Sequence, residues 1–424
     1  MSRVAIVGFG CAGYNAAKAM REAGYDGEIH VFEKTAEGPA NPMLTTYYAG
    51  DKLAYQGAFP FGTQEEIAAE WNLIIHKQAV VARVVAVEKA VLLESGEKEY
   101  FDKILIATGA RAVVPTLEGS QGENIFLMRT MEDAQKLKDH LDTHPVKNAV
   151  VVGGSMVGIK VAELLYNRGI HTTIADMAPY LFPLAAFEDV GREIERRISA
   201  AGIACKWNAG ITSITEKGAG FSDGTTLPAD IVCLCIGTRA NVQLVANTQV
   251  VEDQPVRINR AIVVDDHMRT SCEGIFAAGD CCEGTDLQSG ETMIIGLWAN
   301  AGMQGETAGK NMAGQDAVYP GNIVHNITHF MGMDFIGLGD NRLEGERYTF
   351  GDIRGDNYIE AVMKDGRLQC VNILGNYRIS GILKNHLMKE LAGEDTTLGP
   401  VQKGLLVKNG LDRDFVELIG GGAR

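Results

Sequence analysis

Short apolar runs alternate with longer amphipathic stretches over the first three quarters of the chain, and many of the runs end in glycine or an acidic residue. Arg3 to Val7 and Glu28 to Phe32 are two such runs. The stretch from Ala12 to Ala23 between them has helical spacing and is followed by Gly24. Apolar runs of this length, separated by helices, are typical of buried strands in a parallel sheet. The pattern therefore predicts an α/β fold.

The turn after the first run, GFGCAG, has the spacing of a dinucleotide-binding turn. Gly8 permits the tight turn, Gly10 lets a pyrophosphate approach the backbone, and Gly13 lets the helix pack on the strand. Glu33 ends the next strand 20 residues after Gly13, where a carboxylate accepts hydrogen bonds from a ribose diol. Strand, turn, helix and acid together indicate a dinucleotide site.

The same arrangement returns about 145 residues later. Ala149 to Val152 and His171 to Ala175 are predicted strands on either side of a helix from Met156 to Asn167. The turn between them contains three glycines, Gly153, Gly154 and Gly158. Two such turns predict two Rossmann-like domains and two bound dinucleotides.

The second turn differs from the first in two residues that bear on its ligand. Ser155 stands where the second glycine is usual. Its side chain leaves less room for the pyrophosphate to approach the backbone, but its hydroxyl can reach a phosphate oxygen. Asp176 ends the strand, would repel a 2′-phosphate, and is not followed by Arg in residues 177–180. The second site therefore favours NADH over NADPH.

Three more apolar runs end in glycine, namely Tyr100 to Ala107, Asp230 to Ile236 and Gly274 to Ala278. Parallel strands bring their carboxyl ends to one edge of a sheet, where ligands bind. We expect Gly109, Gly237 and the Gly279-Asp280 pair to lie at such edges.

The hydrophobic pattern changes from about residue 321. Arg347 to Ile353, Tyr358 to Lys364 and Leu368 to Leu374 read as antiparallel strands, with a hairpin turn at Asp365-Gly366, and Ile379 to Leu391 reads as a helix. This part predicts a smaller α+β domain. The tail from residue 399 to 424 is too short for a core of its own and is expected either to dock on a partner subunit or to fray.

Composition agrees with a globular chain. The 424 residues are 46% hydrophobic and 22% charged, enough for about three domains with apolar cores. A net charge of −15 makes nucleic acid and anionic membrane surfaces poor partners. No apolar run approaches the roughly 20 residues that cross a bilayer, and the N-terminus leads directly into a strand, so we expect a cytoplasmic protein without a signal peptide.

The eight cysteines form no CxxC pair and the nine histidines are scattered. This usage predicts reduced thiols, mostly buried as small apolar residues, and no metal site.

In these motifs and in their order, nearly the whole chain resembles the two-dinucleotide flavoprotein disulfide reductase superfamily, and within it the branch of NADH oxidases and rubredoxin and ferredoxin reductases. The matching segments are GFGCAG at 8–13, YFDKILIATGAR at 100–111, NIFLMRTMEDAQKL at 124–137, VVGGSMVGIKVAELL at 151–165, ADIVCLCIGTRAN at 229–241, VDDHMRTSCEGIFAAGDCCE at 264–283 and GLWANAGMQG at 296–305.

The resemblance implies FAD at the first turn and NAD(H) at the second. At FAD it implies Gly8, Gly10, Cys11, Ala12, Gly13, Glu33, Lys34, Pro42, Val84, Ala107, Thr108, Gly109, Arg111, Gly279, Asp280, Leu297, Trp298 and Ala301. At NAD(H) it implies Gly153, Gly154, Ser155, Met156, Val157, Gly158, Asp176 and Gly237.

The resemblance also implies roles for some of these residues. Glu33 would bind the adenosine ribose, Val84 would lie by the adenine, and Asp280 would bind the ribityl or pyrophosphate portion. The helix that begins near Trp298 would point its N-terminus at the N1 and O2 edge of the flavin, where a partial positive charge stabilises the anionic reduced ring. Trp298 is alternatively a plain core residue.

One departure from the superfamily is the segment NPMLTTYYAGDKL at 41–53, which lacks the cysteines that relatives place beside the flavin. Without a thiolate there, electrons have to leave the flavin directly.

Another departure is Lys160, at a position where the family commonly has Glu, while the flavin-facing segment offers Thr45 in place of the usual Lys. Lys160 is either the cation that sits near the flavin N5 atom or the partner of an acidic neighbour without a redox role. With no metal ligands in the chain, the electron acceptor is expected to be an iron-sulfur protein.

The order of motifs implies a discontinuous FAD domain at residues 1–112 and 244–320, an NAD domain at 113–243, and a C-terminal interface domain at 321–424. The chain looks most like the FAD subunits of anaerobic complexes such as phenylglyoxylate dehydrogenase and tungsten aldehyde oxidoreductase, in a hetero-oligomeric assembly. Two alternatives stay open, a stand-alone NADH:rubredoxin or ferredoxin reductase or NADH oxidase, and a non-catalytic flavin-binding redox sensor.

Overall fold

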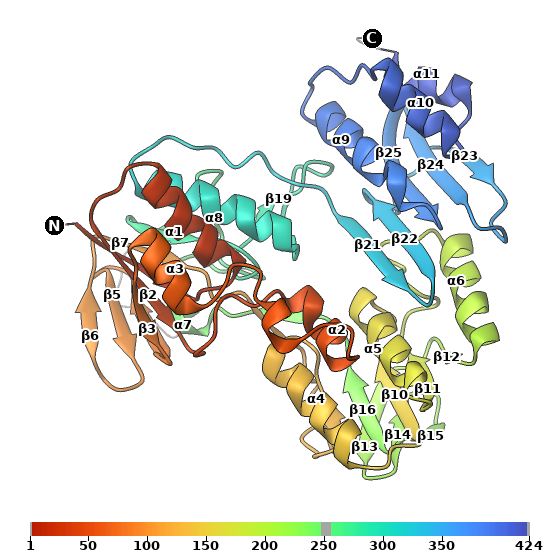
Figure 1. The fold of residues 1–424 in the computed structure, drawn as a ribbon, viewed down its shortest axis with the longest axis horizontal. Coiled ribbons are helices and arrows are strands. Elements are labelled where there is room, and N and C mark those ends of the chain that lie inside the picture. The colour runs from red at the N-terminus through yellow and green to blue at the C-terminus, as the bar shows by residue number, and fades with distance from the viewer. Residues whose placement is uncertain (1, 247–255, 422–424) are drawn as a thin grey trace.

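The computed structural model of the chain describes residues 2–246 and 256–421 and consists of three lobes, as Figure 1 shows. The first lobe is built on a parallel sheet of five strands in the order β18-β7-β1-β2-β3. These strands are β18 (Ile275–Ala277), β7 (Lys103–Ile106), β1 (Arg3–Val7), β2 (Glu28–Glu33) and β3 (Ile74–Lys77).

The two faces of this first sheet are covered by different layers, because successive side chains of a strand point to opposite faces. Val4 and Ile6 of β1 pack toward the helices α1 (Cys11–Glu22) and α8 (Trp298–Met312). Ala5 and Val7 pack in a separate core under an antiparallel three-stranded meander. The meander consists of β4 (Val81–Val85), β5 (Ala90–Leu93) and β6 (Lys98–Tyr100).

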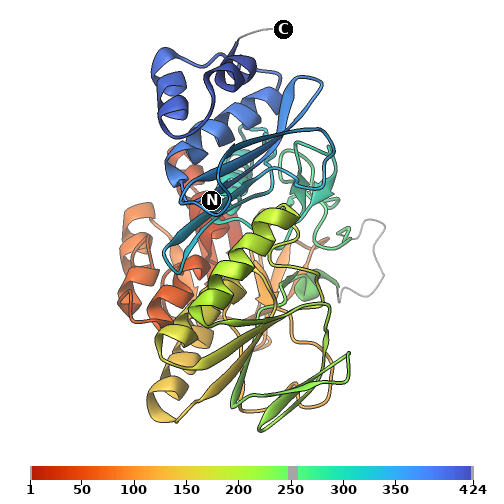
Figure 2. The same ribbon diagram turned by 90° about the vertical axis from the view of Figure 1, so that its right-hand side faces the viewer.

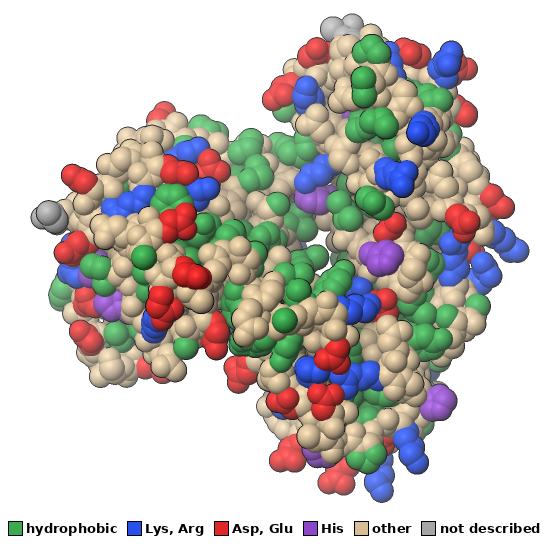
Figure 3. Space-filling view, in the orientation of Figure 1, with side chains coloured by type: hydrophobic (Ala, Val, Ile, Leu, Met, Phe, Trp, Pro, Cys, Tyr) green, Lys and Arg blue, Asp and Glu red, His purple; other side chains and the backbone are tan. Residues whose placement is uncertain are grey.

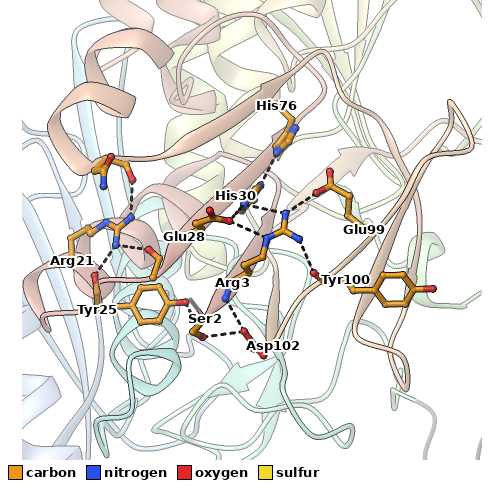
Figure 4. A network of polar contacts seen from close by, with 12 residues as sticks. Ser2, Arg3, Arg21, Tyr25, Glu28, His30, His76, Glu99, Tyr100 and Asp102 are labelled. Carbon is orange, nitrogen blue, oxygen red and sulfur yellow. Dashed lines mark hydrogen bonds and ion pairs between the residues drawn. The ribbon is translucent and has the colours of Figure 1, made fainter.

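A polar network holds the meander to the sheet (Figure 4). The Arg3 guanidinium lies 3.0 Å from Glu28 Oε2 and 3.0 Å from Glu99 Oε2, and it also donates to the Tyr100 carbonyl. Beside it, the rings of His30 and His76 are joined by a 3.0 Å hydrogen bond. One arginine thus links β1, β2 and β6.

The second lobe repeats the first. Its five-stranded parallel sheet has the order β12-β11-β10-β16-β9. The strands are β12 (Ala204–Lys206), β11 (His171–Ala175), β10 (Asn148–Val152), β16 (Ile231–Leu234) and β9 (Ile125–Phe126), with the helices α4 (Met131–Thr143), α5 (Met156–Asn167) and α6 (Glu188–Ala201). A second meander follows, formed by β13 (Ile211–Thr215), β14 (Gly218–Phe221) and β15 (Thr226–Pro228).

Two antiparallel strands connect these lobes. The chain leaves the first sheet through β8 (Ala110–Ala112) and returns through β17 (Thr238–Ala240), and the two strands pair with each other. After β17 come α7 (Gln243–Ala246), then β18, then the small hairpin of β19 (Gly284–Thr285) and β20 (Thr292–Met293). The second lobe is therefore an insertion between two parts of the first.

The third lobe contains an antiparallel sheet of order β21-β22-β25-β24-β23. Its strands are β21 (His325–Phe330), β22 (Met333–Leu338), β23 (Glu346–Gly351), β24 (Tyr358–Lys364) and β25 (Arg367–Leu374), followed by the helices α9 (Ser380–Leu391), α10 (Pro400–Lys408) and α11 (Arg413–Gly420). The fold is α/β with a C-terminal α+β unit, and it agrees with the class predicted from the sequence.

The third lobe packs on the second, with α6 between them (Figure 2). Phe182 and Phe187 of the second lobe share one apolar core with Phe330 and Phe335 of the third. The buried Asn372 side chain accepts from the Phe187 N–H at 2.8 Å and donates to the Ala185 carbonyl at 3.0 Å. These contacts fix the C-terminal sheet on the second lobe.

Two predictions about elements were wrong, and one hairpin was missed. The run from residue 100 to 107 is two strands of different sheets, because Asp102 breaks it and accepts a hydrogen bond from the Arg3 N–H at 2.7 Å. The hairpin of β21 and β22 was not predicted. The C-terminal tail does not fray up to residue 421, since Leu406 of α10 and Phe415 of α11 are buried on the C-terminal sheet of the same chain. Docking of the tail on a partner subunit stays a prediction, and residues 422–424 lie outside the described part.

Among the described residues, no helix has both the length and the apolar character that crossing a membrane requires.

Candidate dinucleotide sites

The first glycine turn joins β1 to α1, and each of its glycines meets a different steric demand. Gly8 has φ +97°, and a Cβ there would lie 2.5 Å from the Ala107 carbonyl oxygen. A Cβ on Gly13 would lie 2.2 Å from the Gly8 carbonyl oxygen, so this glycine lets the helix approach the turn. Around Gly10, by contrast, there is open space. That space, at an uncapped helix N-terminus, fits an anionic group.

The second turn repeats this geometry. Gly153 has φ +116°, and a Cβ on Gly158 would lie 2.0 Å from the Gly153 carbonyl oxygen. Ser155 serves as the N-cap of α5, since its hydroxyl accepts from the Gly158 N–H at 3.1 Å and donates to the Cys235 carbonyl at 3.0 Å. Its hydroxyl hydrogen is therefore used within the protein. Met156 and Val157 begin the helix, and Val157 is 41% exposed.

The acidic residues that end β2 and β11 are held in the same way. Glu33 accepts hydrogen bonds from the N–H groups of Phe9 at 2.8 Å and Thr35 at 3.0 Å. Asp176 accepts from Gly154 at 2.6 Å and Ala178 at 2.8 Å. Each carboxylate is thus anchored to the middle of its own glycine turn, at the edge of the space where a ribose would lie.

The helices α1 and α8 bring their N-termini together. They run parallel in close contact, because Gly305 and Gly309 of α8 lie directly on the backbone of Ala12 and Ala16. At the start, the Cys11 thiol donates to the Trp298 carbonyl at 3.3 Å. Neither helix has a side-chain cap, so both present free backbone N–H groups on the same side.

Other predicted FAD residues converge on these helix ends. Gly279, at the end of β18, lies 3.1 Å from the Ala12 methyl group and 3.6 Å from that of Ala301, measured from a Cβ built on the glycine. Thr108 donates to the Asn241 carbonyl at 2.8 Å, which closes the crossover beside Gly109. Three segments far apart in sequence thus meet at one sheet edge.

Arg129 belongs to this site, but sequence reasoning did not single it out. Its guanidinium forms an ion pair with Asp280 at 2.7 Å and donates to the Ala110 carbonyl at 3.1 Å. It lies directly before Thr130, whose capping box with Asp133 begins α4. The only sequence signal was its place in the segment that carried the resemblance.

Four predicted residues lie outside these direct contacts. Lys34 is exposed, and Pro42 begins a short 3-10 helix, η1 (Pro42–Leu44). Val84 is fully buried under the meander, so its side chain serves the core. Arg111 is exposed and hydrogen-bonds Asn241 and other groups near β17 rather than the glycine turn.

The cysteines near the first turn are not poised for redox chemistry. Burial raises the pKa of the Cys11 thiol to about 12, so it is a neutral thiol at physiological pH. Burial also raises the pKa of Cys281 and Cys282. Both form no disulfide, and their thiols donate hydrogen bonds to backbone carbonyls. The Thr45 hydroxyl, in α2 (Thr45–Ala49), is buried and donates to the Pro42 carbonyl at 2.9 Å.

Lys160 forms an ion pair inside the protein. Its ammonium lies 2.7 Å from Glu163 Oε2, donates to the His329 carbonyl at 2.6 Å, and sits 4.8 Å above the Tyr47 ring centroid. Burial raises the Glu163 pKa, but the hydrogen bonds from Lys160 and from the Met331 N–H outweigh it and leave the pKa below its ordinary value. These contacts show that Lys160 has an acidic partner, Glu163, and a role of Lys160 at the flavin stays a prediction.

Comparison with known proteins shows which family the chain belongs to. Residues 2–305 match the model of the family described as pyridine nucleotide-disulphide oxidoreductase. Among curated relatives, an NADH oxidase of Methanocaldococcus jannaschii is 29% identical over 325 residues, 75% of this chain and 71% of the relative. The NADH-dependent phenylglyoxylate dehydrogenase subunit epsilon of Aromatoleum evansii is 27% identical over 407 residues, 94% of this chain and 93% of the relative.

Solved structures agree in fold. A covalent putidaredoxin reductase–putidaredoxin complex superposes with a TM-score of 0.85 at 21% identity, covering 99% of this chain and 98% of that chain. The water-forming NADH oxidase of Lactobacillus brevis superposes with a TM-score of 0.84 at 22% identity, covering 92% of this chain and 91% of that chain.

The two glycine turns, the acid anchored at each turn and the two adjacent helix N-termini agree with an oxidoreductase that uses a flavin and a nicotinamide dinucleotide. The chain belongs to the pyridine nucleotide-disulphide oxidoreductase family. Its cofactors are FAD and NAD(H), as predicted from the sequence.

Proposed function

We propose that the chain passes electrons between NAD(H) and the iron-sulfur clusters of a partner protein, as the FAD subunit of a larger oxidoreductase. The observation that carries this proposal is the lack of a reactive thiol near the first glycine turn. Segment 41–53 contains no cysteine, and the cysteine that lies within the turn is a buried neutral thiol. Without a thiolate to carry electrons, a protein of this family has to transfer them from the flavin directly to the acceptor.

Two relatives support an external acceptor. One is named as a subunit of an NADH-dependent dehydrogenase and aligns over nearly its whole length, including the C-terminal lobe. Another, a rubredoxin-NAD(+) reductase of Pseudomonas putida, is 28% identical over 325 residues, 75% of this chain and 81% of the relative.

We assign FAD to the first lobe and NAD(H) to the second. Residues 1–112 and 244–320 form the proposed FAD domain, although 247–255 lie outside the described part, and residues 113–243 form the proposed NAD domain. Gly8 to Gly13, Glu33 and Asp280 would hold FAD, with Arg129 offsetting the negative charge near Asp280. Bound FAD supplies the exchange between hydride transfer and single-electron steps.

The protein's own groups orient and bias this chemistry. The free N–H groups at the start of α8 carry a partial positive charge, which would stabilise the negative charge of a reduced flavin bound beside them. Asp176 is held by hydrogen bonds from two backbone N–H groups. Its carboxylate would accept hydrogen bonds from the ribose hydroxyls of NADH and would repel a 2′-phosphate.

Co-purification tests the subunit role most directly. The tagged chain, expressed in its native cell and purified without oxygen, should bring down chains that contain iron and acid-labile sulfide. The purified holoprotein should also lose its visible flavin absorbance on addition of NADH, whether or not it has been treated with iodoacetamide. Loss of NADH reduction after alkylation would contradict the direct route.

A stand-alone oxidase is the second candidate, favoured by the similarity to the archaeal NADH oxidase. It predicts that the isolated chain consumes oxygen with NADH as fast as it reduces ferricyanide. The subunit proposal predicts slow oxygen consumption and fast ferricyanide reduction. A redox sensor would show no turnover with either acceptor.

A further inference from the structure

One difference between the two glycine turns lies at the residue between the first and the last glycine of the motif. Gly10 in the first turn corresponds to Ser155 in the second, since each stands two residues after the first glycine and three before the last. At each turn, a Cβ on the first glycine would lie within 2.5 Å of the carbonyl oxygen that follows a neighbouring strand, Ala107 in one and Cys235 in the other. The Ser155 side chain therefore occupies a place that the first turn leaves without a side chain.

Both hydrogen-bonding directions of the Ser155 hydroxyl are used within the protein. The hydroxyl accepts from the Gly158 N–H at 3.1 Å and donates its hydrogen to the Cys235 carbonyl at 3.0 Å. A serine hydroxyl has one hydrogen and two lone pairs, so a ligand would meet only the remaining lone pair. That lone pair cannot donate to a phosphate oxygen, and it repels negative charge.

The capping bond also changes what the helix offers to an anion. The first N–H groups of a helix have no partner within the helix and are the groups that bind phosphate. In α1 they have no side-chain cap, and the space around Gly10 is open. In α5 the Gly158 N–H is taken by Ser155. The second turn thus offers a pyrophosphate one donor fewer and less room.

The second turn is also closer to solvent than the first. Cys11 and Ala12, the first residues of α1, are buried, whereas Val157 in the first turn of α5 is exposed. The second lobe forms one side of the hollow where the three lobes meet (Figure 3). A nucleotide that is released in every turnover needs access of this kind, and a cofactor that stays bound does not.

We propose that Ser155 lowers the affinity of the second site for NAD(H) and so keeps it a site of exchange. The inference rests on the proposed function, which assigns NAD(H) to the second lobe, and adds the residue that weakens the hold on the nucleotide. NAD(H) is exchanged after each hydride transfer, so tighter binding of both its forms would lower KM without raising kcat.

Ser155→Gly tests this role. Glycine is nearly as good an N-cap as serine, so the variant should fold and retain FAD. Isothermal titration of the oxidised, FAD-loaded protein with NAD+ should give a Kd about tenfold below that of the parent, the effect of one hydrogen bond to a charged group. A hydroxyl that donated to a phosphate would give the opposite sign. A Kd equal to or above the parent's would therefore overturn the proposal.

Two further variants separate the turn from general effects on folding. Ser155→Ala removes the hydroxyl but keeps the Cβ, and should lower the Kd less than Ser155→Gly does. Thr63→Gly is the matched control, because the Thr63 hydroxyl caps α3 (Gln64–Trp71) of the first lobe by accepting from the Glu66 N–H at 3.2 Å. Its Kd for NAD+ should stay within twofold of the parent, and an equal fall in this variant would also overturn the proposal.

The parent protein distinguishes this inference from the proposed function. If the FAD-loaded parent binds no NAD+ and keeps its flavin absorbance on addition of NADH, the proposed function itself fails. If NADH reduces the parent but Ser155→Gly binds NAD+ no more tightly, only the role of Ser155 fails.

Discussion

A buried carboxyl at the contact between the second and third lobes should make folding stability depend on pH. Glu360, in β24, is 1% exposed. It accepts from the Tyr358 hydroxyl at 3.1 Å, lies 2.7 Å from the Arg347 guanidinium, and faces Asp189 at the start of α6. Burial, and then the negative charge of Asp189, raise the pKa of Glu360 to about 7 against the opposing effects of Tyr358 and Arg347.

The sign and size of the effect follow from the raised pKa. The folded protein binds a proton at Glu360 that the unfolded chain, with a carboxyl pKa of 4.5, has already released. Stability from this group is therefore present below pH 4.5 and is lost as pH rises through 7. The loss amounts to about 3 kcal/mol, since each pKa unit corresponds to about 1.4 kcal/mol.

Glu360→Gln removes this titration while keeping the shape of the side chain. The variant should match the parent in thermal unfolding at pH 5 and exceed it at pH 8, where the gain of about 3 kcal/mol corresponds to several degrees in melting temperature. Asp189→Asn removes only the neighbouring charge and should give a smaller gain at pH 8. A Glu360→Gln variant less stable than the parent at pH 8 would refute the reasoning, because the pairing with Arg347 would then outweigh burial.

Three other predictions follow from the sites. Gly10→Ala should fold with unchanged melting temperature in its FAD-free form but retain little FAD, measured as flavin absorbance per protein. Gly13→Ala should lose stability even without FAD, and equal behaviour of the two variants would contradict the steric assignment. Asp176→Ala with Met177→Arg should shift the ratio of kcat/KM for NADH over NADPH by about a hundredfold toward NADPH, and an unchanged ratio would exclude Asp176 from the ribose site. Lys160→Met should cost roughly 2 kcal/mol of stability and leave the flavin midpoint potential unchanged, whereas a shifted potential would favour a cation at the flavin.

Much of the dinucleotide architecture was predictable from contiguous sequence. The turns around Gly8 and Gly153, the helix from Met156 to Asn167 and the acids Glu33 and Asp176 lie where the pattern placed them. The reason is local: a strand, a glycine turn and a helix N-terminus are specified within about 30 residues, and each glycine answers a steric demand of its own turn.

The tertiary structure decided which distant side chains meet. Arg129 reaches Asp280 across 151 residues and Lys384 reaches His325 across 59, and no period or spacing in the sequence announces either contact. Glu163 lies three residues after Lys160 on the same helix, so this partner was available from the sequence, whereas only the fold placed the His329 carbonyl and the Tyr47 ring at the Lys160 ammonium group. A motif specifies its own backbone, but the charge environment of a side chain depends on every element packed against it, and that packing exists only in the folded chain.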